Sequence, residues 1–163
     1  MQIIAADIHT QPGNIAWDRF LVEDPQYPGE PPAARIEAVC QSIHAALDPS
    51  NTIAPVFAKK WSKFSAQAAR ELKTQPTQVR FDNSTSEQYT IITLFAYDRM
   101  GLLYSVSKVL FEMQLVLHIA KISTHLDQVV DVFYVSDLEG RKIEESTALY
   151  LIRQRLLQAV GEE

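Results

Sequence analysis

The feature that most constrains the fold is an internal repeat, in which two stretches about 114 residues apart follow one pattern. Ile4-Ala-Ala-Asp-Ile-His-Thr10 and His118-Ile-Ala-Lys-Ile-Ser-Thr124 share Ala, Ile and Thr at every second position. The match continues after a one-residue slip, which falls in a turn-like Gln11-Pro-Gly-Asn14. The matched ranges are 4–10 with 118–124, 18–24 with 131–137, and 36–47 with 149–160. Because one register joins two strands and a helix, the chain is expected to hold two related units.

The second unit can be read from its beginning. A β-branched and aromatic run predicts a strand, a break follows, and apolar residues at three- and four-residue spacing predict a helix. Two strands joined by a short hairpin and a closing helix come next. The expected ranges are 89–97, 102–113, 116–125, 129–136 and 144–160. This order predicts an α+β fold, an antiparallel sheet with both helices on one face.

The first unit begins in its middle, because Met1 aligns with Leu115 and the counterpart of residues 89–114 is missing. Either the chain is a fragment of a longer protein or something else completes this unit. The strand at 15–24 and the helix at 36–47 are then expected to lack their usual cover, which favours a homodimer.

Three segments follow from this reading. Residues 1–50 form the truncated unit, residues 51–76 form a linker, and residues 77–163 form the complete unit. The linker is expected to contain an amphipathic helix at 56–73, and this helix could instead pack over the gap in the first unit. A strand at 77–82 could belong to either sheet.

Composition excludes several classes of protein. Fifteen Lys and Arg against 20 Asp and Glu give a net charge of −5, which argues against a general nucleic-acid binder. No signal peptide or 18-residue apolar run occurs, so we expect a cytoplasmic chain with no membrane span. The single Cys40 cannot form an internal disulfide, and its neighbours on the helix predict a core position. No cofactor or metal is expected.

The best candidate site is the loop between the strand at 89–97 and the helix that follows. A helix N-terminus favours an anion such as an amino-acid carboxylate, and Gly101 permits close backbone approach. Asp98 could accept from an ammonium or amide group, or could simply cap the helix. Arg99 is a ligand contact or a solvated or interface charge, and His118 is a ligand or interface residue or a plain edge residue. The candidate ligand-binding residues are Asp98, Arg99, Met100, Gly101, Leu102, Leu103 and His118.

Other polar residues favour structural roles. His118 and His125 are seven apart, so on one strand they face opposite ways and cannot share a metal ion. Asp131 and Asp18 recur in both units, which favours a backbone or hairpin role over acid catalysis. The basic run around Trp61 is expected to be the solvated face of the linker helix.

Several of these segments resemble a known family. Asp98-Arg-Met-Gly-Leu-Leu-Tyr104, His118-Ile-Ala-Lys-Ile122 and Asp131-Val-Phe-Tyr-Val135 resemble the last ACT domain of protein PII uridylyltransferases. Ile4-Ala-Ala-Asp-Ile8 and Trp17-Asp-Arg-Phe-Leu-Val22 resemble the second half of the preceding ACT domain. The loop departs from the family's usual Asp-Arg-Pro-Gly, because Met100 replaces the proline.

The resemblance implies ferredoxin-like βαββαβ modules that sense glutamine and regulate catalytic sites located earlier in such proteins. We therefore expect a regulatory module, not an enzyme, that binds an amino acid between the 98–103 loop and an edge strand of the other unit. One rival is a ligand-free module for dimerisation or docking. A second is an RNA-binding ferredoxin-like domain, and an enzyme is the least favoured because no catalytic constellation is visible.

Overall fold

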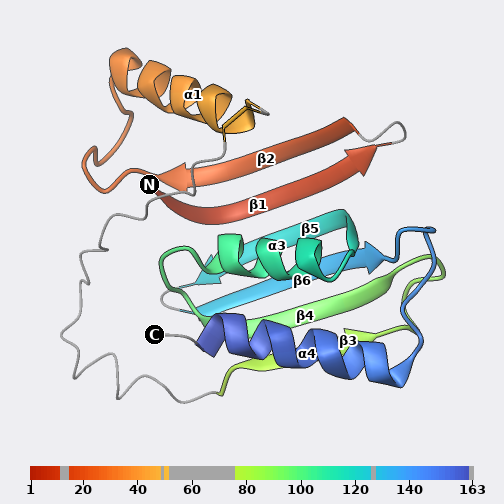
Figure 1. The fold of residues 1–163 in the computed structure, drawn as a ribbon. Coiled ribbons are helices and arrows are strands. Elements are labelled where there is room, and N and C mark those ends of the chain that lie inside the picture. The colour runs from red at the N-terminus through yellow and green to blue at the C-terminus, as the bar shows by residue number, and fades with distance from the viewer. Residues whose placement is uncertain (12–14, 49, 52–75, 126–127, 162–163) are drawn as a thin grey trace.

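A computed structural model describes residues 1–11, 15–48, 50–51, 76–125 and 128–161. These residues contain three helices and six strands (Figure 1). They are β1 (Gln2–Gln11), β2 (Ile15–Glu23), α1 (Ala33–Leu47), β3 (Gln78–Asp82), β4 (Thr90–Tyr97), α3 (Leu102–Glu112), β5 (Val116–His125), β6 (Gln128–Ser136) and α4 (Ser146–Gly161). The turn expected at residues 11–14 and the linker helix expected at 56–73 lie largely or wholly outside the described residues.

All six strands form one antiparallel sheet in the order β2-β1-β5-β6-β4-β3. The second unit contributes β5-β6-β4-β3, which is the ferredoxin-like order with β3 in the place of the last strand. The alternatives left open for residues 77–82 are thereby resolved, since β3 pairs with β4. The two units meet where β1 pairs with β5, with Ala6 opposite Ile122.

The hydrophobic core lies between the second unit's sheet and the helices α3 and α4, which cover the same face (Figure 1). Alternation along β4 and β6 sends Ile92, Leu94 and Phe133 toward the helices, and each is at most 1% exposed. The helix α4 contributes the buried side chains of Ile152 and Leu156, which lie four residues apart on one face. The expected α+β arrangement, with both helices on one face, is confirmed.

The first unit is not covered in this way. Every residue of β2 is exposed, and α1 has no buried residue. Cys40 is exposed, so its predicted core position is wrong. The reason is that α1 carries an apolar stripe without packing it on the sheet. No helix in the described ranges is long and apolar enough to span a membrane.

Candidate functional site

The loop at residues 98–101 connects the end of β4 to the start of α3. Gly101 has φ 74°, a left-handed conformation that glycine adopts without strain, and it stands at the N-cap of α3. The helix begins at Leu102, so the prediction that Asp98 caps it is wrong. The first turn of α3 contains no acidic residue and no side-chain cap, so the positive end of this helix carries no anion of its own.

Asp98 lies at the seam between the two units. Its Oδ2 accepts a hydrogen bond from Nε2 of Gln2, at 3.4 Å, and Gln2 is the first residue of β1. The loop of the second unit therefore borders β1 of the first unit, which is an inner strand between β2 and β5 and not the edge strand that the sequence analysis expected. Gln2 was not predicted, because no pattern in the sequence marks which β1 residue reaches the loop.

Asp131 is a buried carboxyl close to this loop. Its side chain is on β6, the residue is 1% exposed, and the Ser123 N–H donates to its Oδ1 at 3.4 Å. Burial, with a smaller contribution from the Asp98 carboxylate, raises the pKa of Asp131 to about 7, although the hydrogen bond from Ser123 acts in the opposite direction. The recurrence of Asp131 and Asp18 in the two units predicted a bond to the backbone, and Asp131 makes one with the Ser123 N–H. Its counterpart Asp18 is exposed on β2.

Arg99 points away from the seam and toward the end of α4. Its Nε donates to the Val160 carbonyl at 3.3 Å, and its Nη2 donates to the Ala159 carbonyl. The last carbonyls of a helix have no partner within the helix, and a guanidinium can satisfy two at once. Arg99 is therefore a C-terminal cap of α4, a role that sequence analysis did not consider.

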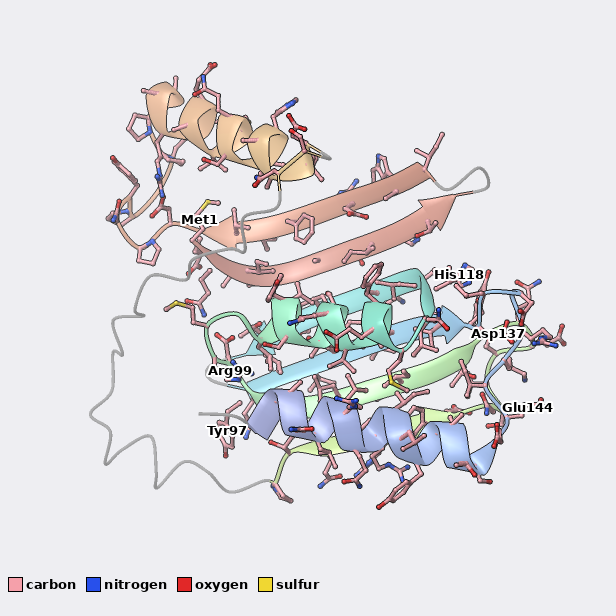
Figure 2. The ribbon with its side chains drawn as sticks, viewed as in Figure 1. Met1, Tyr97, Arg99, His118, Asp137 and Glu144 are labelled. Carbon is pink, nitrogen blue, oxygen red and sulfur yellow. The ribbon has the colours of Figure 1, made fainter. Side chains whose placement is uncertain are left out.

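His118 is separated from the loop by the length of the sheet. Tyr97, which precedes the loop, pairs with Gln128 at one end of β6, whereas His118 bonds to Ser136 at the other end. At about 3.3 Å per residue the nine residues of β6 place these ends roughly 25 Å apart. Figure 2 shows Tyr97 and Arg99 at one end and His118 with Asp137 at the other. His118 and the 98–103 loop thus do not form one site.

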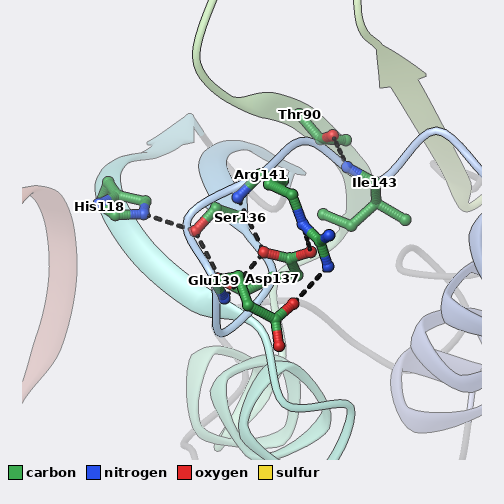
Figure 3. A network of polar contacts seen from close by, with 7 residues as sticks. All are labelled: Thr90, His118, Ser136, Asp137, Glu139, Arg141 and Ile143. Atoms are coloured by element: carbon green, nitrogen blue, oxygen red, sulfur yellow. Dashed lines mark hydrogen bonds and ion pairs between the residues drawn. The ribbon is translucent and has the colours of Figure 1, made fainter.

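His118 belongs to a polar network that fixes the loop after β6 (Figure 3). Its ring stacks on Tyr89 at 4.4 Å between centroids, and its Nε2 lies 2.8 Å from the Ser136 hydroxyl. That hydroxyl donates its proton to the Asp137 carbonyl, so Nε2 must be the protonated nitrogen. Burial lowers the pKa of His118, which favours the neutral ring with its single proton on Nε2.

A broad hollow of about 1020 Å³ opens beside this network, lined by Tyr89, His118 and the loop around Leu138. Its rim is polar, but Arg141 pairs with Asp137 at 2.9 Å and also with Glu139. Because Arg141 is already paired with these two carboxylates, the hollow is a weaker ligand candidate than the 98–103 loop. Among the residues that the structure describes, no group of three metal-ligating side chains comes together.

The sheet order and the match to known proteins define the class of this chain. Residues 85–162 match a family described as "ACR family N-terminal ACT domain". The second unit is therefore an ACT domain.

Nearly the whole chain is similar to part of one kind of protein within that class. Over 159 residues, which are 96% of its length, the chain is 35% identical to the bifunctional uridylyltransferase/uridylyl-removing enzyme of Novosphingobium aromaticivorans. The enzymes of the same name from Erythrobacter litoralis and Azospirillum brasilense are 36% and 31% identical over 98% of the chain. The chain spans about 17% of the length of these relatives. No solved structure matches it.

Proposed function

We propose that the chain is a regulatory amino-acid sensor that binds glutamine at the seam between its two units. The observation that carries the proposal is the contact between Gln2 of β1 and Asp98 of the ACT-domain loop. A ligand seated there touches both units at once. A regulatory role is supported by the ACT-domain match and by the relatives, which are named as uridylyltransferase/uridylyl-removing enzymes.

The chemistry of the loop suits an amino acid. The start of α3 offers backbone N–H groups and a positive dipole end to a carboxylate, and Gly101 lets the ligand approach the backbone. The Asp98 carboxylate can accept hydrogen bonds from an α-ammonium or from a side-chain amide. The Gln2 contact supports this assignment, because it shows the Asp98 carboxylate accepting from a carboxamide, the group that distinguishes glutamine from glutamate.

Regulation then follows from the position of the site. A ligand shifts an equilibrium only if it prefers one arrangement of the parts that it touches. Glutamine held between the loop and β1 would favour one orientation of the two units. In the longer relatives this orientation would be the signal to catalytic domains, and we propose that the chain itself performs regulation in the cytoplasm without catalysis.

We also propose that the chain is a homodimer. The proposal is supported by the exposed edge strand β2 and by the unpacked apolar stripe of α1. An open strand edge beside apolar side chains invites pairing with a second chain.

The test is a thermal-shift titration of the whole chain with glutamine, with glutamate as the comparison ligand. At about 100 times its dissociation constant, a ligand stabilises the folded state by roughly 2.7 kcal/mol. We expect glutamine to raise the melting temperature more than glutamate. Gly101→Val should abolish the response, because a branched Cβ blocks the approach to the backbone.

Gly140→Val is the matched control. Gly140 also has a positive φ, 80°, but lies in the loop after β6, so the variant bears similar backbone strain and should keep the glutamine response. Asp98→Ala separates a ligand contact from a purely structural bond to Gln2. Loss of binding with little loss of stability supports a ligand contact. If none of the twenty amino acids at millimolar concentration shifts the melting temperature, the ligand-free interaction module becomes the better interpretation.

A further inference from the structure

The seam where β1 pairs with β5 is nearly symmetrical in its sequence (Figure 1). The internal repeat aligns residues 4–10 of β1 with residues 118–124 of β5. These two strands run antiparallel beside each other, and Asp7 lies opposite Lys121. In the repeat Asp7 and Lys121 occupy the same position, so each lies opposite its own counterpart. The seam therefore has an approximate twofold axis, perpendicular to the sheet, that passes through this pair.

The side chains on the helix-facing side of the seam fit any pairing of these strands. Ala6 lies opposite Ile122, and Ile8 lies opposite Ala120. Three of the four are buried, and Ile8 packs against the same core. Because alanine and isoleucine hold the same positions in both copies of the repeat, two β1 strands or two β5 strands would make the same alanine–isoleucine contacts. Apolar packing along the seam thus does not determine that β1 pairs with β5.

The other face of the seam does distinguish these pairings. Asp7 and Lys121 lie between the apolar positions, so they point to the face away from α3, and both are exposed. Directly opposed residues of antiparallel strands have Cβ atoms about 4.5–5.5 Å apart, where opposite charges stabilise the pair and like charges destabilise it. Pairing β1 with β5 places a carboxylate opposite an ammonium group. Pairing either strand with its own kind would place two like charges on the axis.

The neighbouring strands make this contrast strongest for β5. Lys121 has Val132 of β6 opposite it on its other side, so Asp7 is its only charged partner in the ladder. Asp7 also lies opposite Arg19 of β2, so the charges alternate across these three strands. Two paired β1 strands would keep an arginine beside each aspartate. Two paired β5 strands would bring two lysines together with no carboxylate opposite either of them.

We propose that Asp7 and Lys121 determine which strands meet at the seam, so that the first unit pairs with the second and like units do not pair. The repeat makes the apolar contacts equal, and this charge pair supplies the difference. The pairing decides what lies beside the Asp98 loop, because Gln2 of β1 has Val116 as its counterpart on β5. Two second units paired about Lys121 would place a valine there instead of the Gln2 carboxamide. The selection requires no bound ligand, so it can fail or hold separately from glutamine binding.

Disulfide reporters in the whole chain distinguish the two pairings. In the observed seam His9 lies opposite Ile119, so His9→Cys with Ile119→Cys forms an intrachain disulfide. If two β5 strands paired about Lys121, Ile119 of each chain would lie opposite Ser123 of the other. Ile119→Cys with Ser123→Cys therefore reports that pairing by an interchain disulfide, since four residues along one strand are too far apart to join. Both reporters carry Cys40→Ser, because Cys40 is an exposed free thiol.

We expect mostly the intrachain disulfide, and little of the interchain one, at millimolar protein concentration in a thiol redox buffer. Asp7→Lys removes the difference in charge between β1–β5 and β5–β5 pairing, so the interchain yield should rise roughly threefold or more. Adding Lys121→Asp restores opposite charges at the seam and should return this yield to the wild-type value. About 1 M salt should weaken the effect of Asp7→Lys, because the Debye length falls to roughly 3 Å.

Asp18→Lys is the matched control. It makes the same change in charge on the exposed strand β2, opposite Ile8, and should leave both disulfide yields unchanged. An interchain yield that Asp7→Lys does not raise, or that Asp18→Lys raises equally, would overturn the proposal. Failure of the charge swap to restore the wild-type yields would also overturn it, including the case in which Asp7→Lys alone does not fold.

Discussion

Replacing the buried carboxyl of Asp131 by an amide should stabilise the protein increasingly as the pH rises. Burial raises the pKa of Asp131 from an ordinary 3.8 to about 7, with the nearby Asp98 carboxylate acting in the same direction. Asp131→Asn keeps an oxygen that accepts from the Ser123 N–H but cannot ionise. The variant therefore removes the cost of placing a charge in the core and leaves the packing nearly unchanged.

The sign and size follow from proton linkage. The unfolded chain releases the Asp131 proton near pH 4 and the folded chain near pH 7, so between these values the unfolded state binds fewer protons. The free energy of unfolding of the wild type therefore falls as the pH rises through this window. At about 1.4 kcal/mol per pKa unit, the full loss approaches about 4 kcal/mol above pH 7. The Asn variant escapes this loss.

The measurement is urea unfolding of both proteins at pH 5, 6, 7 and 8. Other titrating groups contribute equally to both chains, so the difference between them isolates Asp131. Asp18→Asn is the matched control, because Asp18 occupies the equivalent exposed position of the first unit and its replacement should change stability little at any pH. A difference between wild type and Asp131→Asn that stays constant from pH 5 to pH 8 would refute the reasoning.

Two further predictions concern polar contacts that hold loops in place. Arg99→Ala should lower the free energy of unfolding by about 1–2 kcal/mol, because it frees the carbonyls of Ala159 and Val160 at the end of α4; urea unfolding checks this, and an unchanged stability would contradict the capping role. Thr90→Val should cost about 1–3 kcal/mol, since the buried Thr90 hydroxyl accepts from the Ile143 N–H at 2.9 Å and donates to Asn83 at 2.7 Å. Hydrogen exchange at Ile143 should accelerate in this variant, and slow exchange there would argue against the assigned bond.

The periodicity of the sequence predicted most of the second unit. The strand expected at 116–125 has those bounds, and the closing helix expected at 144–160 spans Ser146–Gly161. These elements were predictable because each buries one regular set of apolar residues in a single core. The repeat also identified the first unit's strands, and β2 is exposed because it lies at the edge of the sheet that the described residues form.

The predictions that were wrong concern residues whose surroundings depend on tertiary contacts. Asp98 is the kind of residue that caps helices, but the left-handed Gly101 ends the turn three residues later, so Asp98 meets the other unit instead. Cys40 lies among apolar residues in the sequence, yet burial requires a surface to pack against, and α1 lacks one. His118 lies near the start of its expected strand, but α3 runs back along the sheet before that strand begins, so His118 is at the end of the sheet far from the 98–103 loop.

The position of β3 makes the second unit a circular permutant of the standard ferredoxin-like order. The edge strand precedes β4 in the chain, where the standard order would place it after α4. As a result Asp82 pairs with Ile91, nine residues away, in a local hairpin. A strand after Gly161 would have to pair with β4 across more than sixty residues.

This permutation changes how the domain can fold. Closing the short hairpin instead of the long loop reduces the closure cost by about 2 kcal/mol. It also lowers the contact order, which favours faster folding. The edge of the sheet far from the seam can therefore form early, before α4 is in place. A permuted second unit, cut in the 83–89 loop and joined between residues near 77 and 161, should fold more slowly and keep the same sheet.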